Sequence, residues 1–346
     1  MKKILALALC LIMVLSVVAC TKAPAEKDYK LGMGIVVKTD STKETNAQVD
    51  ATIAAVVTDA DGKIVFCRID VAQNKMTVEN GTVDANKEFK TKMELGDDYN
   101  MAKYGQPNVE GGTVKEWYVQ TKAFEEYVIG KTAAEVEAIK LQEVNNHQIA
   151  VDEALLNAGC TMQITEFMAA VVKACNDEQG MSFKAAEGSF TLGVAAKTSA
   201  ADSKSVAGET AGLVAMYSDI AACVVAGDKV IATINDAIQP KIDVAVDGTL
   251  APQEFKGTKR ELKEGYNMAA YGQPNVEGGT VKEWYIQSKA FSEYVVGKTA
   301  TEIAGMQTKE VNNHQISVEE ALLNAGCTMQ ITGICAVVAQ AANNAR

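Results

Sequence analysis

Residues 104–118 read YGQPNVEGGTVKEWY, and residues 271–285 repeat these fifteen letters without a change. The two copies start 167 residues apart (271 minus 104). Two more blocks return at the same spacing: EVNNHQI at 143–149 and 310–316, and ALLNAGCTMQIT at 154–165 and 321–332. A unit of this length is a domain rather than a solenoid repeat. The sequence therefore predicts two tandem homologous domains, over residues 30–176 and 190–346, joined by a polar linker at 177–189.

Each unit is predicted to begin with a β-hairpin. An apolar, β-branched run at 52–57 leads into Asp61-Gly62, which is a turn signal, and a second run follows at 63–69. The second unit shows the same pattern around Gly227-Asp228.

Several helices are predicted after the hairpin. Thr113 with Glu116 and Thr132 with Glu135 have the spacing of capping boxes, so helices are expected to start at Val114 and just after Thr132. A short helix is expected over 152–156, ending at Gly159, and a final one after Thr165. Each unit is thus a small antiparallel sheet or hairpin followed by several helices, and the fold class is α+β.

The N-terminus has the features of an export signal. Lys2 and Lys3 precede an apolar run that ends in Val18-Ala19-Cys20, which resembles the lipobox of bacterial lipoproteins. We expect residues 1–19 to be a signal peptide, Cys20 to carry the lipid, and residues 20–29 to be the lipidated tether. The resemblance implies a protein held by lipid at the extracytoplasmic face of the cell membrane.

The chain is acidic, with a formal net charge of −11. Removing residues 1–19 takes away two lysines and no acid, so the mature chain is more negative still. Nucleic acid would be repelled by such a surface, and we expect no nucleic-acid partner.

Six cysteines remain besides Cys10 and Cys20, and only Cys160 and Cys327 occupy matching places in the two units. A disulfide framework inherited by duplication would show matched pairs, so we interpret these residues as buried thiols. The spacing suggests no metal site.

A glycine turn before the last helix of each unit is the first candidate site. It comprises Gly159, Cys160 and Thr161, and in the second unit Gly326, Cys327 and Thr328. Free backbone N–H groups near a helix N-terminus suit a phosphate. The alternative is a turn in which the threonine hydroxyls cap backbone groups.

This turn and the preceding hairpin distantly resemble exported FMN-binding domains of bacterial electron-transfer proteins. In that family a threonine after a glycine is esterified to the FMN phosphate, and the resemblance places Thr161 and Thr328 at that position. Cys160, Ala158 and Leu155 depart from the family pattern, which has alanine, serine or threonine, and aspartate there. The chain also resembles duplicated, uncharacterised lipoproteins of Gram-positive anaerobes.

The repeated glycine-rich loop has aromatic neighbours that form a second candidate site. Tyr104 and Trp117, with Tyr271 and Trp284 in the second copy, are able to sandwich a flat ligand or to pin the loop to the core. Both interpretations stay open at this point.

His147 and His314 are the only histidines in the chain. Without a nucleophile pattern or further histidines nearby, a hydrolase or zinc site lacks its partners. We interpret them as polar turn residues, with a thiolate pair between His147 and Cys160 as the alternative if the fold joins them.

Two functions fit these observations. The first is a non-enzymatic surface binding module with two equivalent ligand-binding domains, whose partner is a small ligand. The second is an FMN-binding, extracellular electron-transfer lipoprotein, with FMN as cofactor and a redox partner.

Overall fold

The structure is a computed structural model that describes residues 25–346. The predicted signal peptide, Cys20 and most of the predicted tether lie outside the described residues. Within them the fold is mixed α/β, with antiparallel sheets and short helices, as predicted from the sequence. No helix among residues 25–346 is long and apolar enough to cross a membrane.

The first half of the chain runs from β1 to α6. Its sheet has the strand order β3-β2-β1-β6, all antiparallel, and the predicted hairpin is its β2–β3 pair. The elements are β1 (Glu26–Lys38), β2 (Asn46–Asp59), β3 (Ile64–Thr77), α1 (Lys92–Leu95), η1 (Gly96–Tyr99), α2 (Met101–Tyr104), α3 (Trp117–Tyr127), α4 (Ala133–Glu137), β4 (Leu141–Val144), β5 (His147–Ala150), α5 (Glu153–Ala158) and α6 (Thr165–Cys175).

The second half runs from β7 to α12, after the connecting strand β6 (Met181–Ala186). It has one sheet of order β10-β9-β7 and a smaller one of order β12-β11-β8. The elements are β7 (Thr191–Ser199), β8 (Gly212–Ala215), β9 (Tyr217–Ala226), β10 (Lys229–Ile238), β11 (Lys241–Val244), β12 (Leu250–Pro252), α7 (Lys259–Leu262), η2 (Lys263–Tyr266), α8 (Met268–Tyr271), α9 (Trp284–Tyr294), α10 (Ala300–Ala304), β13 (Thr308–Val311), β14 (His314–Ser317), α11 (Glu320–Ala325) and α12 (Thr332–Asn343).

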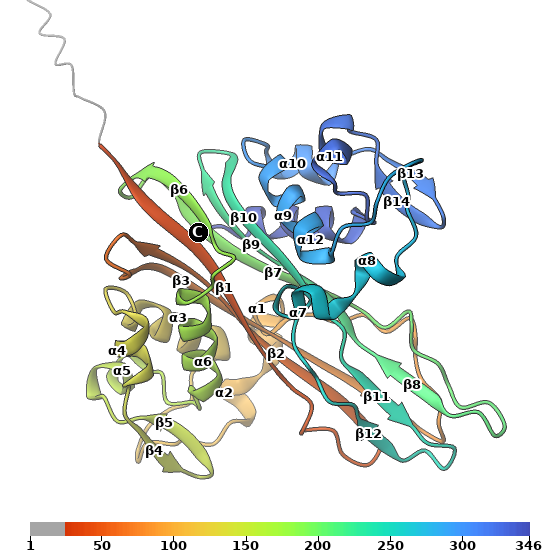
Figure 1. The fold of residues 1–346 in the computed structure, drawn as a ribbon. Helices are drawn as coiled ribbons and strands as arrows, with labels where there is room; N and C mark the ends of the chain where they lie inside the picture. Colours follow the sequence, from red (N-terminus) through yellow and green to blue (C-terminus); the bar gives the residue numbers. More distant parts are fainter. Residues whose placement is uncertain (1–24) are drawn as a thin grey trace, which may run out of the picture.

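The sheets of the two halves pack face to face over one shared core. Because side chains alternate across a strand, Leu31 and Ile53 point to this core, and Leu192 and Ile220 reach it from the other sheet. Figure 1 shows the sheets crossing in the middle, with helices α3 to α6 on one outer side and α9 to α12 on the opposite side. The layers are therefore helix, sheet, sheet, helix.

Glycines let the terminal helices lie close to the sheets. A Cβ on Gly32 would come within 2.0 Å of the Ala174 carbonyl oxygen in α6, and a Cβ on Gly193 within 2.0 Å of the Ala341 oxygen in α12. Any side chain there would force the helix away from the strand.

The helix predictions are mostly confirmed. Thr132 and Glu135 form the predicted capping box of α4, and Gly159 ends α5 with a φ of +98°. The start at Val114 is wrong, because α3 begins at Trp117, and its N-cap Glu116 makes no side-chain capping bond.

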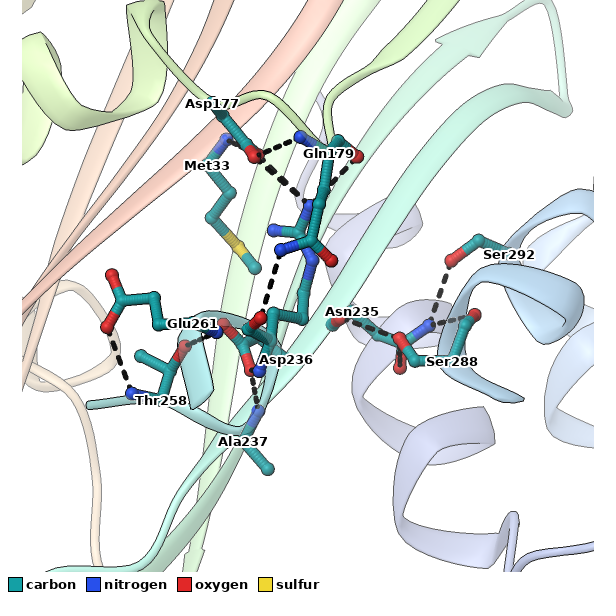
Figure 2. A network of polar contacts seen from close by, with 11 residues as sticks. Met33, Asp177, Gln179, Asn235, Asp236, Ala237, Thr258, Glu261, Ser288 and Ser292 are labelled. Carbon is teal, nitrogen blue, oxygen red and sulfur yellow. Dashed lines mark hydrogen bonds and ion pairs between the residues drawn. The ribbon is translucent and has the colours of Figure 1, made fainter. Parts of the chain in front are cut away.

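The predicted linker at 177–189 is wrong in one respect, since it contains β6, which pairs with β1. Its first residues enter a polar network with the second half, which Figure 2 shows around Asp177, Gln179 and Asp236. Arg260 is 7% exposed, and its Nη2 donates to Asp177 Oδ2 at 3.1 Å and to the Gln179 carbonyl at 2.9 Å. The segment 177–189 therefore holds α7 against the first half.

Candidate functional site

A cavity of about 760 Å³ in the first half brings three of the sequence motifs together. Tyr104, Trp117, His147 and Thr161 all line it. Its walls come from β1 and β2, from α1, from the loop before α3, from the β4–β5 hairpin and from the start of α6. The volume lies within the usual range for small-molecule sites.

The two aromatic residues of the repeated loop differ in burial. Trp117 is 2% exposed and belongs to the core beneath the cavity, whereas Tyr104 is 72% exposed at its edge. Trp117 therefore supports the core and closes the cavity floor. Trp284 is similarly buried and Tyr271 similarly exposed in the second half.

The turn at Thr161 does not offer all the free N–H groups that the sequence suggested. Thr161 N donates to Gln120 Oε1 at 2.9 Å, and the Thr161 hydroxyl lies 3.4 Å from the same oxygen. Gly159 lies beneath the Lys115 side chain, whose Nζ donates to the Ala158 carbonyl. Gln120 therefore takes up both the N–H and the hydroxyl of Thr161.

The fold does not support the alternative of a thiolate pair between Cys160 and His147. Cys160 is buried in the core, and its burial raises the pKa of the thiol to about 12. His147 is exposed at the start of β5, after a turn in which Asn145 and Asn146 have φ values of +51° and +62°. Within residues 25–346 no group of three or more His, Cys, Asp or Glu side chains is arranged to hold a metal ion.

The histidine motif contributes instead through its asparagine. Asn145 Nδ2 donates to Asn108 Oδ1 at 3.2 Å, and Asn108 Nδ2 donates to the Thr161 carbonyl at 2.9 Å. We call Asn108, Gln120, Asn145 and Thr161 the amide frame. It ties the loop, α3, the β4–β5 turn and the glycine turn into one unit.

Lys92 is a site residue that the sequence interpretation missed. Its Nζ lies 4.7 Å from the centre of the Tyr99 ring and 5.6 Å from that of Trp117, inside the cavity lining. No carboxylate in the described part of the chain forms an ion pair with it. The sequence did contain a signal for this lysine, because TKMEL at 91–95 returns as TKREL at 258–262.

The strand wall of the cavity carries charge. Lys38 of β1 forms an ion pair with Glu166 of α6, and Gln163 and Thr165 also donate to this carboxylate. Burial raises the pKa of Glu166, but these hydrogen bonds outweigh it and bring the pKa to about 2. Glu166 is therefore ionised at neutral pH.

The second half repeats the frame contact by contact. Asn275 donates to the Thr328 carbonyl at 2.9 Å, Thr328 N donates to Gln287 Oε1 at 2.9 Å, and Asn312 donates to Asn275 Oδ1 at 3.2 Å. Lys259 Nζ lies 4.9 Å from the Tyr266 ring centre and 5.4 Å from that of Trp284. Gly326 again ends a helix with positive φ, and Cys327 is buried.

Comparison with known proteins gave no match: no family model, no curated protein and no solved structure corresponds to this chain.

Proposed function

We propose that this chain is a binding protein that takes a small ligand with a flat, polar ring and an anionic group in the first-half cavity. The observation that carries the proposal is Lys92, a cation without a carboxylate partner among residues 25–346 that lies over two aromatic rings in an amide-lined cavity.

The lining indicates the chemistry of the ligand. Amide side chains both donate and accept hydrogen bonds, which suits the edge of a heterocycle with N–H and C=O groups. Gln73, Gln106, Asn108, Gln120, Asn145, Asn146 and Gln163 provide them. The aromatic faces of Tyr99 and Trp117 compensate the Lys92 charge only in part, so its N–H donors suit an anionic group.

The sequence repeat extends the proposal to both halves. The amide frame and the lysine over its aromatic rings recur around Lys259, so we propose two tandem homologous units, each with a ligand site. Held by a lipid at Cys20 outside the cell, two sites on one chain would raise the effective affinity for a clustered ligand.

FMN is a second candidate, favoured by the Thr161 side chain on the cavity wall. The residues present fit its groups: the amide side chains suit the ring edge, Lys92 suits the phosphate, and Thr161 stands at the position that carries the ester in the resembling family. When bound, FMN would supply electron-transfer chemistry. The chain's own part is to hold the ring and limit its contact with water.

Titration with FMN and with riboflavin tests both proposals. The chain has two tryptophans, one in each half, so Trp284→Phe leaves Trp117 as the sole reporter of the first cavity. We expect FMN to quench Trp117 saturably and to raise the melting temperature. Absence of both effects would overturn the proposed ligand class, and an unmodified Thr161 peptide after co-expression with a flavin transferase would exclude the covalent form.

A further inference from the structure

The strand wall is where the two halves differ. In the first half Lys38 of β1 pairs with Asp50 of β2, and in the second half Ser199 of β7 pairs with Tyr217 of β9. The amide frame on the opposite side is unchanged. The differences between the two sites therefore come from the strands and from the start of the terminal helix.

Asp50 lines the first cavity and carries an unsatisfied acceptor. Its Oδ2 accepts a hydrogen bond from Gln48 Nε2 at 2.7 Å, but its buried Oδ1 has no partner among residues 25–346. Buried polar atoms without a partner are rare, and each requires an explanation. Asp50 lines the cavity, so its carboxylate stands where it would accept a hydrogen bond from a donor group on a ligand.

In the second half a carboxylate stands at a different position of the equivalent strand. Val36 pairs with Thr52 as Lys197 pairs with Asp219, so Asp219 takes the place of Thr52, two residues beyond Asp50 on the same strand face. Two residues of a strand span roughly 6–7 Å.

A glycine in α12 accommodates the moved carboxylate. A Cβ on Gly333 would come within 2.1 Å of Asp219 Oδ2, and Gly333 stands where the first half has Glu166. The two changes fit each other, since one removes a carboxylate from the helix and the other brings one from the strand. Asp219 forms no ion pair in the described part of the chain.

The lysine opposite Asp219 is held by the rest of the fold. Arg260, the residue after Lys259, donates its backbone N–H to Asp236 Oδ1 on β10 at 3.1 Å, and its side chain binds Asp177 (Figure 2). Strand β10 pairs with β9, which carries Asp219. The distance between the cation and the carboxylate is therefore set by the scaffold.

We propose that Asp50 and Asp219 determine the specificity of two non-equivalent sites, each accepting a hydrogen bond from an N–H or ammonium group of a ligand whose anionic group binds Lys92 or Lys259. This inference rests on the ligand site proposed above. The two acceptors stand two residues apart when the two halves are compared strand by strand. The two sites therefore prefer ligands that differ in the distance between their hydrogen-bond donor and their anionic group.

Asparagine substitutions in the full chain test this. Asp50→Asn and Asp219→Asn keep the size of the side chain and remove the charged acceptor. With FMN and riboflavin as probes, Trp284→Phe reports the first site and Trp117→Phe the second. We expect Asp50→Asn to weaken flavin binding about tenfold at the first site and to leave the second unchanged, and Asp219→Asn to do the reverse.

Two further variants guard against loss of folding. Asp219→Thr and Asp50→Tyr introduce the residue that the other half has at that position, and urea unfolding checks that each variant is native. This inference is overturned if Asp50→Asn and Asp219→Asn leave flavin binding unchanged, or if each alters it equally at both sites. Either result leaves the proposed function intact. Failure of both flavins to bind the unmodified chain overturns both.

Discussion

Arg260 Nη2 lies 3.3 Å from Asp177 Oδ1 and 3.1 Å from Asp177 Oδ2, although 83 residues separate the two in sequence. Both side chains are less than a tenth exposed. The pair joins the connector after α6 to α7, and Met93 occupies the position of Arg260 in the first half. This ion pair thus joins the two halves. It is made by the residue of the second half, and the related position of the first half has no charged side chain.

Removing one partner of this pair is expected to be costly. Arg260→Met, which copies the first half, leaves the Asp177 carboxylate buried without its cation and should reduce the free energy of unfolding by about 3 kcal/mol. Urea unfolding followed by circular dichroism measures this.

The double variant Arg260→Met/Asp177→Asn provides the control. It removes both charges, so it should recover part of the loss, giving a favourable coupling energy in a double-mutant cycle. Strictly additive effects would show that the two side chains contribute independently.

Glu125 makes stability depend on pH. Its burial raises the pKa from 4.5 to about 7, against the opposing effects of the hydrogen bond from Ile69 N and the charge of Arg68. The folded state then binds a proton that the unfolded state has released, so stability falls as pH rises from about 4.5 to 7. Glu125→Gln should flatten this slope, because it removes a contribution to the free energy of unfolding that changes by on the order of 3 kcal/mol across this pH range.

Unfolding at a series of pH values checks this for both chains. The Glu125→Gln substitution keeps an acceptor for Ile69 N, and the second half has Ser292 at the related position, so a neutral residue is compatible with the fold. Parallel stability curves for the two chains would contradict the prediction.

The glycines beneath the terminal helices should not tolerate a methyl group. Gly32→Ala and Gly193→Ala each place a Cβ against a helix carbonyl, so each should cost about 2 kcal/mol and lower the melting temperature. Gly265→Ala is the matched control, because nothing lies within 4 Å of its added Cβ and its φ is ordinary. Equal melting temperatures for all three variants would show that the helices adjust freely.

Lys92 should bind the anionic group of the probe. Lys92→Ala is expected to weaken FMN binding at the first site about tenfold and to leave riboflavin, which lacks the phosphate, nearly unaffected. Lys103→Ala, which removes a lysine that lies over the exposed Tyr104 ring, is the control and should alter neither. An equal loss for both flavins would mean that Lys92 only supports the aromatic rings.

Local signals in the sequence predicted local structure well. The Asp61-Gly62 turn joins β2 to β3, and Thr132 with Glu135 caps α4, because both depend on neighbouring residues alone. The shared core was not predicted, because it depends on which face of a strand meets a partner far away in sequence. In the structure β2 is buried on nearly every residue, so both of its faces are covered.

The residues that line the cavity were predicted only in part, for the same reason. Trp117 and Thr161 stand in repeated motifs, and the fold brings both to the cavity. Asp50 and Lys38 lie outside every repeated block, and only the pairing of β1 with β2 places them opposite the amide frame. These two residues differ between the two halves, so a comparison of repeated motifs does not find them.

The two-sheet core also bears on how the protein is made. The inner faces of β1 and β2 leave the ribosome well before β7 and β9, whose side chains will cover them. This apolar surface therefore stays exposed to water during most of translation. A chain that ends inside the second half would keep the surface exposed permanently. Such fragments should depend on holding chaperones and precipitate without them.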